Sequence, residues 1–130
     1  MSSMHRLQRR VHQTAKSKGF WDKDLELIEA TLNFPDHTQL ADHVRRLIVC
    51  TKLALIHSEG SEAVESVRED QPAFFIDENG KPQGIASELA DVIIRCMDLA
   101  EFLEIDLGSV IEIKTAYNEY RKPMHGGKAL

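Results

Sequence analysis

The chain has 130 residues, of which 42% are hydrophobic, and this size and composition fit one domain with a modest core. Its formal net charge of −5 argues against a protein that wraps duplex DNA, whereas a bound metal ion lets an acidic site accept a small anion. The N-terminus carries no apolar signal segment, and no apolar run is long enough to span a bilayer. We therefore expect a cytoplasmic protein that binds neither nucleic acid nor membranes.

Apolar residues recur at helical spacing along most of the chain. The pattern predicts helices over residues 4–17, 22–32, 38–68, 85–104 and 106–121. Pro123 prevents the last helix from continuing. On the two central helices, the residues expected in the core are Val44, Ile48, Leu55 and Ile56, followed by Leu89, Val92, Ile93, Cys96, Leu99 and Phe102. Cys50 and Cys96 both sit in apolar helical patterns, which favours two reduced thiols in the core.

Residues 69–84 lose the helical pattern and contain two prolines and two glycines. Asn79-Gly80 is a tight-turn signal, and Phe74–Ile76 can form one arm of a small hairpin. The sequence therefore predicts an all-α bundle of four to five helices with at most one hairpin. Its single domain would span residues 1–130, with N-terminal helices over 1–37, core helices over 38–121 and a flexible tail over 122–130.

Two pairs of carboxylates fall on helix faces that are otherwise apolar. Glu59 and Glu62 are spaced i, i+3 and continue the face that Ile48 and Leu55 begin, and Glu88 and Asp91 repeat the pattern on the later helix. Four converging carboxylates repel one another and lose solvation, which a hard divalent cation such as Mg²⁺ offsets. The alternative is that these acids are solvated at the rim of the bundle. A di-iron bundle is disfavoured because the chain has no Glu-x-x-His motif.

These motifs resemble, in order, those of MazG-like nucleoside triphosphate pyrophosphohydrolases. The stretch over residues 52–63 resembles the first metal motif of that family, and Glu88-Leu-Ala-Asp91 resembles the second. The last helix adds Lys114-x-x-x-Asn118-x-x-Arg121, followed by a tail with His125-Gly-Gly-Lys128. The resemblance covers roughly residues 44–128. Gly60 departs from what a helix favours, because glycine there costs about 1 kcal/mol relative to alanine.

The resemblance implies Mg²⁺-dependent hydrolysis, with Mn²⁺ as a substitute, of nucleoside triphosphates to the monophosphate and pyrophosphate. Glu59, Glu62, Glu88 and Asp91 would hold the metal, and Glu62 is the candidate general base. The implied substrate-binding residues are Lys114, Asn118, Arg121, His125 and Lys128. Trp21 either stacks on the nucleobase or belongs to the core. Lys52 and Arg95 lie near the acids and either pair with them or extend to solvent.

The resemblance also implies a homodimer or homotetramer, with the hydrophobic remainder of the helix over residues 38–68 buried between chains. Two rival functions belong to other classes. One is a nucleotide-binding regulator that keeps the metal site without turnover. The other is a helical interaction module whose acids are ordinary surface charges. Metal-dependent stability and pyrophosphate release distinguish the three.

Overall fold

The computed structural model describes residues 1–121 and 123 and has the predicted all-α architecture. Its described part contains five α-helices, one short 3-10 helix (η1) and one two-stranded hairpin. In chain order the elements are α1 (Ser3–Ser17), α2 (Asp22–Ala30), η1 (Thr31–Asn33), α3 (His37–Arg68), β1 (Phe75–Ile76), β2 (Pro82–Gln83), α4 (Ile85–Phe102) and α5 (Leu107–Tyr120). The predicted helices are confirmed to within a few residues at each end. None of these described helices is both long and apolar enough to cross a membrane.

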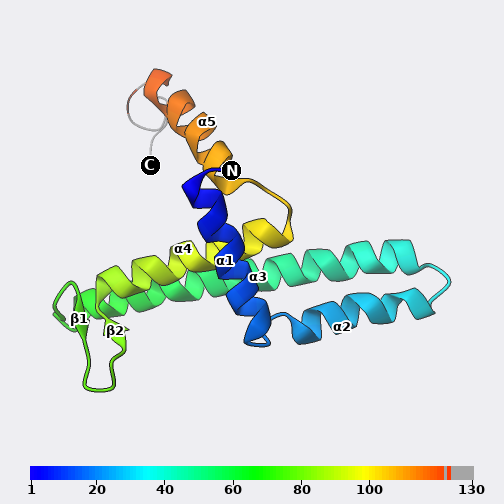
Figure 1. Cartoon of the computed structure of the whole chain (residues 1–130), viewed down its shortest axis with the longest axis horizontal. Coiled ribbons are helices and arrows are strands. Elements are labelled where there is room, and N and C mark those ends of the chain that lie inside the picture. The colour runs from blue at the N-terminus through cyan, green and yellow to red at the C-terminus, as the bar shows by residue number, and fades with distance from the viewer. Residues whose placement is uncertain (122, 124–130) are drawn as a thin grey trace.

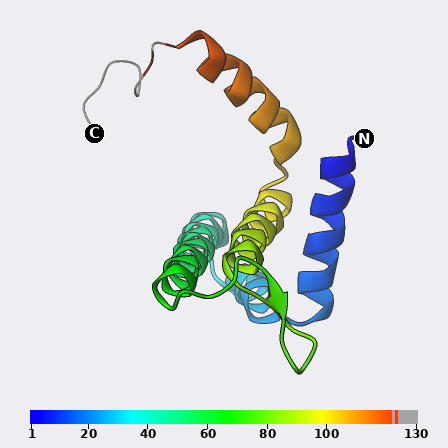
Figure 2. The same cartoon turned by 90° about the vertical axis from the view of Figure 1, so that its left-hand side faces the viewer.

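The centre of the fold is an antiparallel pair formed by α3 and α4. With 32 residues, α3 is about 48 Å long, and α4 lies along its later part, beyond the first turns of α3 (Figure 1). Arg45 of α3 lies over the ring of Phe102 near the end of α4, whereas Glu59 of α3 contacts Arg95 earlier in α4, which fixes the antiparallel direction. Figure 2 shows α1 on the far side of α4 from α3. This arrangement makes α4 the middle element of the structure.

A tight hairpin sets the start of α4. The Asp77 carboxylate accepts hydrogen bonds from the backbone amides of Asn79 and Lys81, both at 2.9 Å, and so closes the turn between β1 and β2. Gly84, just before α4, has φ +90°, and a Cβ there would lie 2.7 Å from the carbonyl oxygen of Ala73. Only glycine fits such a position. The hairpin therefore fixes where the first turn of α4, which carries Glu88, begins.

The hydrophobic core is small and is centred on one tryptophan. Trp21 is 1% exposed, and its ring stacks on that of Phe102 with centroids 4.5 Å apart. Val44 and Ile48 of α3 are buried in the same cluster, as the helical pattern predicts. The core thus joins the turn after α1 to the first half of α3 and the end of α4.

Several residues predicted for the core lie on the surface instead. Leu89 and Ile93 are 53% and 54% exposed, because α4 turns the face bearing Met97 and Leu99 inward. Leu55 is also exposed, and Cys50 is exposed rather than a core thiol. Cys96 is half-buried, and burial raises the pKa of its thiol. The helical period identified the apolar stripes correctly but could not tell which stripe packs against the other helices of the same chain.

The last helix, α5, is attached by its first turn. Gln8 of α1 is 1% exposed; its side-chain amide donates to the carbonyl oxygen of Ile105 at 2.8 Å and accepts from the backbone amide of Leu107 at 3.3 Å. Gly108 comes close to Met4, so that a Cβ at this position would lie 3.3 Å from the Met4 sulfur. Beyond this joint α5 extends away from the α3–α4 pair (Figures 1 and 2).

Candidate metal centre

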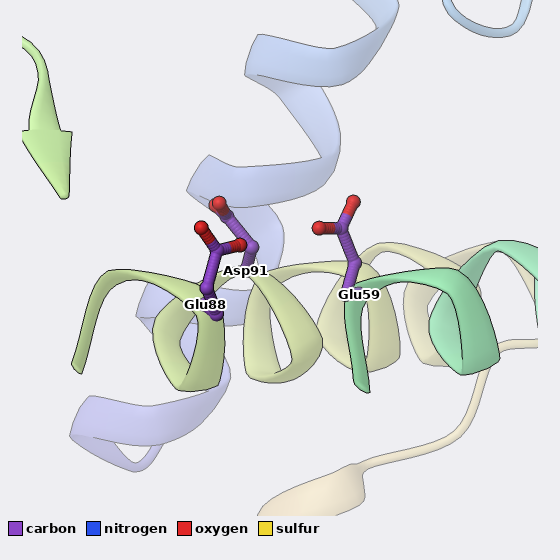
Figure 3. Close-up of side chains that lie close together, drawn as sticks. All are labelled: Glu59, Glu88 and Asp91. Atoms are coloured by element: carbon purple, nitrogen blue, oxygen red, sulfur yellow. The ribbon is translucent and has the colours of Figure 1, made fainter. Parts of the chain in front are cut away.

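Three of the four predicted metal ligands converge where α3 and α4 face each other. Glu59, Glu88 and Asp91 each offer one carboxylate oxygen, and these oxygens lie within 4.8 Å of one another. Figure 3 shows the three side chains pointing to the same side of the two helices. Around one octahedral Mg²⁺, ligand oxygens lie about 3.0 Å apart when adjacent and about 4.2 Å apart when opposite. Small side-chain rotations therefore bring this group to ligand geometry.

Glu62, the fourth predicted ligand, lies at the rim of this group. Its side chain is exposed, one helical turn after the buried Glu59. It is not among the three described residues whose oxygens meet, yet its charge acts on Glu88, whose pKa it helps to raise. Glu62 is therefore close enough to serve the same site while keeping access to water.

The local electrostatics favour a bound cation. Burial raises the pKa of Glu88, and the charges of Glu62, Asp91 and Glu59 raise it further. Burial also raises the pKa of Asp91, with a contribution from Glu59, while Arg95 acts in the opposite direction. Both carboxylates are thus harder to ionise than ordinary acids unless positive charge is supplied. An all-oxygen donor set of this kind fits Mg²⁺ or Mn²⁺.

One cation of the chain already contacts the group. The Arg95 guanidinium donates through Nε to Oε1 of Glu59, forming an ion pair between α4 and α3. The Glu59 side chain is 9% exposed, whereas the Arg95 side chain is 41% exposed. The sequence left open whether Arg95 pairs with an acid of the site or extends to solvent. In the structure it pairs with an acid of the site.

A cavity of about 370 Å³ opens beside the carboxylates. Its walls come from α1, α3 and α4, together with the turn after α1. The lining residues are Val11, Ala15, Phe20, Lys52, Leu55, Glu59, Asp91, Ile94, Arg95 and Asp98. The cavity therefore combines an apolar wall with two cations and the edge of the acidic group.

The sequence reasoning missed the polar network at the far end of this cavity. Asp98 accepts a hydrogen bond from Nδ1 of His12 at 2.7 Å and another from Nε1 of Trp21 at 2.9 Å. Lys52 lies 4.1 Å above the Trp21 ring and pairs with Asp24 at 3.0 Å. Lys52 thus pairs with an acid outside the candidate metal centre. The sequence did hold one signal for Asp98: it follows Asp91 by two helical turns and therefore lies on the same face of the helix.

In this structure Trp21 belongs to the core rather than to a stacking site. One face of its ring packs on Phe102, and Lys52 lies over the ring at 4.1 Å. At 1% exposure the ring offers no free face to a nucleobase. The core alternative for Trp21 is therefore the one that the structure supports.

The predicted substrate-binding residues of the last helix do not reach the carboxylates of their own chain. Lys114, Asn118 and Arg121 are exposed on or next to α5, the part of the structure that extends away from α3 and α4 (Figure 2). The Nζ of Lys114 lies 5.2 Å above the ring of Tyr117, its neighbour on the same helix. His125 and Lys128 fall outside the described residues.

Comparisons with models of known protein families, with curated proteins and with solved structures gave no match to this chain.

Proposed function

We propose that this protein hydrolyses nucleoside triphosphates, including deoxynucleoside triphosphates, to the monophosphate and pyrophosphate in a Mg²⁺-dependent reaction. The observation that carries the proposal is the group of three carboxylate oxygens within 4.8 Å of one another, beside a cavity lined by Lys52 and Arg95. Divalent cations held by carboxylates characteristically bind substrate phosphates. The resemblance of the sequence motifs to MazG-like pyrophosphohydrolases selects the α–β phosphoanhydride as the bond that is broken.

The roles follow from position and exposure. Glu59, Glu88 and Asp91 would hold Mg²⁺, which offsets phosphate charge when bound, and Glu62 would stand at the edge of the site. In the reaction, water would add to the α-phosphorus while its proton passes to the Glu62 carboxylate. The bond from the α-phosphorus to the bridging oxygen breaks, and pyrophosphate leaves with that oxygen and the bonding electrons. Glu62 is exposed and so has access to that water.

The cavity next to the carboxylates is our candidate for the nucleoside. Leu55, Ile94 and Phe20 give it an apolar wall, and Asp98 lies at the end away from Glu88. An apolar cavity with a few polar groups is the usual form of a small-molecule site. The base preference would depend on this wall and on Asp98. His12 and Trp21 already donate to the Asp98 carboxylate, so a base could use only its remaining lone pairs.

We further propose that the active unit is a homodimer or homotetramer. The chain exposes 9863 Å², whereas a compact monomer of 14.7 kDa is expected to expose about 6,900 Å². Much of the exposed surface is apolar and lies on helix stripes, including Leu47, Leu53 and Val64 on α3, Leu89 and Ile93 on α4, and Ile113 and Tyr117 on α5. In such an oligomer, α5 of one copy would bring Lys114, Asn118 and Arg121 to the carboxylates of another.

A mixing experiment tests this arrangement. Glu88→Gln and Arg121→Ala should each be inactive alone. If the two residues act from different copies, a mixed dimer has one intact site, and equal mixing restores about a quarter of wild-type turnover. No recovery after verified subunit exchange would show that α5 does not act in trans.

Turnover itself is tested with a panel of canonical and modified triphosphates, assayed for pyrophosphate with Mg²⁺ and with EDTA. We expect pyrophosphate to be released with Mg²⁺ but not with EDTA, and we expect the turnover of Glu62→Gln to be at least about 100-fold lower than that of wild type. Stabilisation by Mg²⁺ and nucleotide without release would indicate a regulator that binds nucleotide. Neither stabilisation nor release would indicate an interaction module and would exclude the proposed activity.

A further inference from the structure

Arg95 and a divalent cation compete for the same carboxylate. Glu59 is both the partner of the Arg95 guanidinium and one of the three residues whose oxygens meet in the candidate metal centre. Because the Glu59 side chain is 9% exposed, solvent screens little of the repulsion between an arginine and a metal ion that share it. The two cations cannot both bind Glu59 at full strength.

Arg95 is placed to move when it leaves Glu59. Its side chain is 41% exposed and lines the cavity next to the carboxylates. Only Nε donates to Glu59, and the two terminal amino groups make no hydrogen bond to the residues that the structure describes. An arginine has five N–H donors in a planar fork that matches phosphate oxygens, so this side chain retains the capacity to bind a phosphate.

We propose that Arg95 is the resident counter-ion of Glu59, that a divalent cation replaces it, and that the released guanidinium then binds the triphosphate. The inference rests on the proposed function and adds an order to it. Metal binding would prepare the site for the nucleotide by freeing a cation in cis. It also assigns a phosphate-binding residue on α4, on the same chain as the carboxylates.

The test compares wild type with Arg95→Gln and with a matched control, Arg46→Gln. Arg46 forms the same kind of Nε-to-carboxylate pair, with Asp42 at 2.9 Å, on the same helix as Glu59 but about 20 Å away along it. Mn²⁺ binding without nucleotide is followed by electron paramagnetic resonance at pH 8. We expect Arg95→Gln to bind Mn²⁺ about tenfold more tightly than wild type, and Arg46→Gln to stay within about twofold.

A second arm measures the affinity for a triphosphate with a non-hydrolysable α,β-imido bridge at saturating Mn²⁺. Arg95→Gln should bind it at least about tenfold more weakly. Arg95→Lys, which retains the charge without the fork, should keep Mn²⁺ affinity near wild type and still weaken nucleotide binding. Circular dichroism confirms that each variant folds, and the lysine variant carries the test if Arg95→Gln does not fold.

Unchanged or weaker Mn²⁺ binding in Arg95→Gln, or unchanged nucleotide affinity in both Arg95 variants, would overturn the inference. If wild type binds Mn²⁺ and releases pyrophosphate while the Arg95 variants behave like Arg46→Gln, this inference alone fails. If wild type neither binds Mn²⁺ nor turns over, the proposed function fails and this inference fails with it.

Discussion

Asp91 and Asp98 are the same residue type, two turns apart on one face of α4, yet their surroundings are opposite. Asp98 accepts hydrogen bonds from His12 and Trp21. Asp91 lies among other carboxylates, and burial together with Glu59 raises its pKa. The site around Asp98 is complete within the chain, whereas the site around Asp91 holds more negative charge than the chain neutralises.

These opposite surroundings indicate different roles for the two carboxylates. A buried carboxylate with two donors stabilises the fold and orients the groups it touches. A group of acids that costs stability persists where something else compensates, and in the proposed function a divalent cation does so. The comparison therefore predicts that substitutions at the two positions change stability in opposite directions.

The largest change in stability is expected at Asp98, whose hydrogen bonds are satisfied within the chain. Asp98→Ala leaves the Trp21 indole N–H and the His12 ring without an acceptor in a poorly exposed place, and should lower the free energy of unfolding by about 3 kcal/mol. Asp98→Asn retains one acceptor oxygen and should lose about half as much. Urea unfolding monitored by tryptophan fluorescence measures both. Equal stability of wild type and Asp98→Ala would remove the contrast between the two ends.

At Asp91, which lies among like charges, the change in stability is expected to have the opposite sign. Asp91→Asn removes one of several like charges, so in EDTA it should be as stable as wild type or more stable, by up to about 1 kcal/mol after solvent screening. We expect Mg²⁺ to raise the melting temperature of wild type and to leave that of Asp91→Asn unchanged. Differential scanning fluorimetry with and without Mg²⁺ measures both effects. Marked destabilisation in EDTA would mean that Asp91 is a structural residue like Asp98.

The pH dependence sharpens the same contrast. Glu88 and Asp91 have raised pKa values, so folding takes up protons between the ordinary and the raised values, and in that window their effect lowers stability as the pH rises. Asp77 and Asp106, whose pKa values are lowered mainly by hydrogen bonds from Gln83 and from the Ser109 amide, give stability that is lost as the pH falls through those lowered values.

It follows that the stability gained by Asp91→Asn in EDTA should be full above the raised pKa and should vanish below the ordinary carboxyl pKa. Urea titrations of wild type and variant across the acid range measure this difference, while the contributions of Asp77 and Asp106 cancel between the two proteins. A gain that is independent of pH would show that charge is not its cause.

The smallest effect is expected at Gly60, next to Glu59. Apart from its chain neighbours and the backbone of its own helix, a Cβ at Gly60 would meet no heavy atom within 4 Å, and the residue lies inside the continuous helix α3. Close packing within the chain therefore does not explain this glycine. Gly60→Ala should stabilise the protein by about 0.5–1 kcal/mol. If unfolding shows that gain while turnover falls, the open space at Gly60 serves the substrate or a second copy.

Local pattern was enough to predict the helices and three of the four carboxylates expected to converge, while Glu62 lies exposed beside them. The i, i+3 spacing and the helical period placed Glu59 and Glu88 on inward faces because both depend only on the geometry of one helix. The contacts of Asp98 with His12 and Trp21 join segments far apart in the chain, and no spacing rule encodes them.

The outward stripe of Leu89 and Ile93 and the direction of α5 were missed for a related reason. A period shows that a face is apolar without showing whether the same chain covers it. The exposed apolar surface on α3, α4 and α5 is what a partner copy would bury. Under the proposed oligomer, Lys114 and Arg121 would act on the carboxylates of another copy, which no pattern within one chain encodes.

The most direct test of the account is calorimetric titration of Mg²⁺ into wild type, Asp91→Asn and Asp98→Asn without nucleotide. The two variants remove the same charge from the same face of α4, so they differ only in which end of that face is changed. We predict saturable binding to wild type, affinity within about threefold in Asp98→Asn, and at least a tenfold loss in Asp91→Asn. No saturable binding to wild type, or equal binding by wild type and Asp91→Asn, would contradict the assignment of the carboxylates as a metal centre.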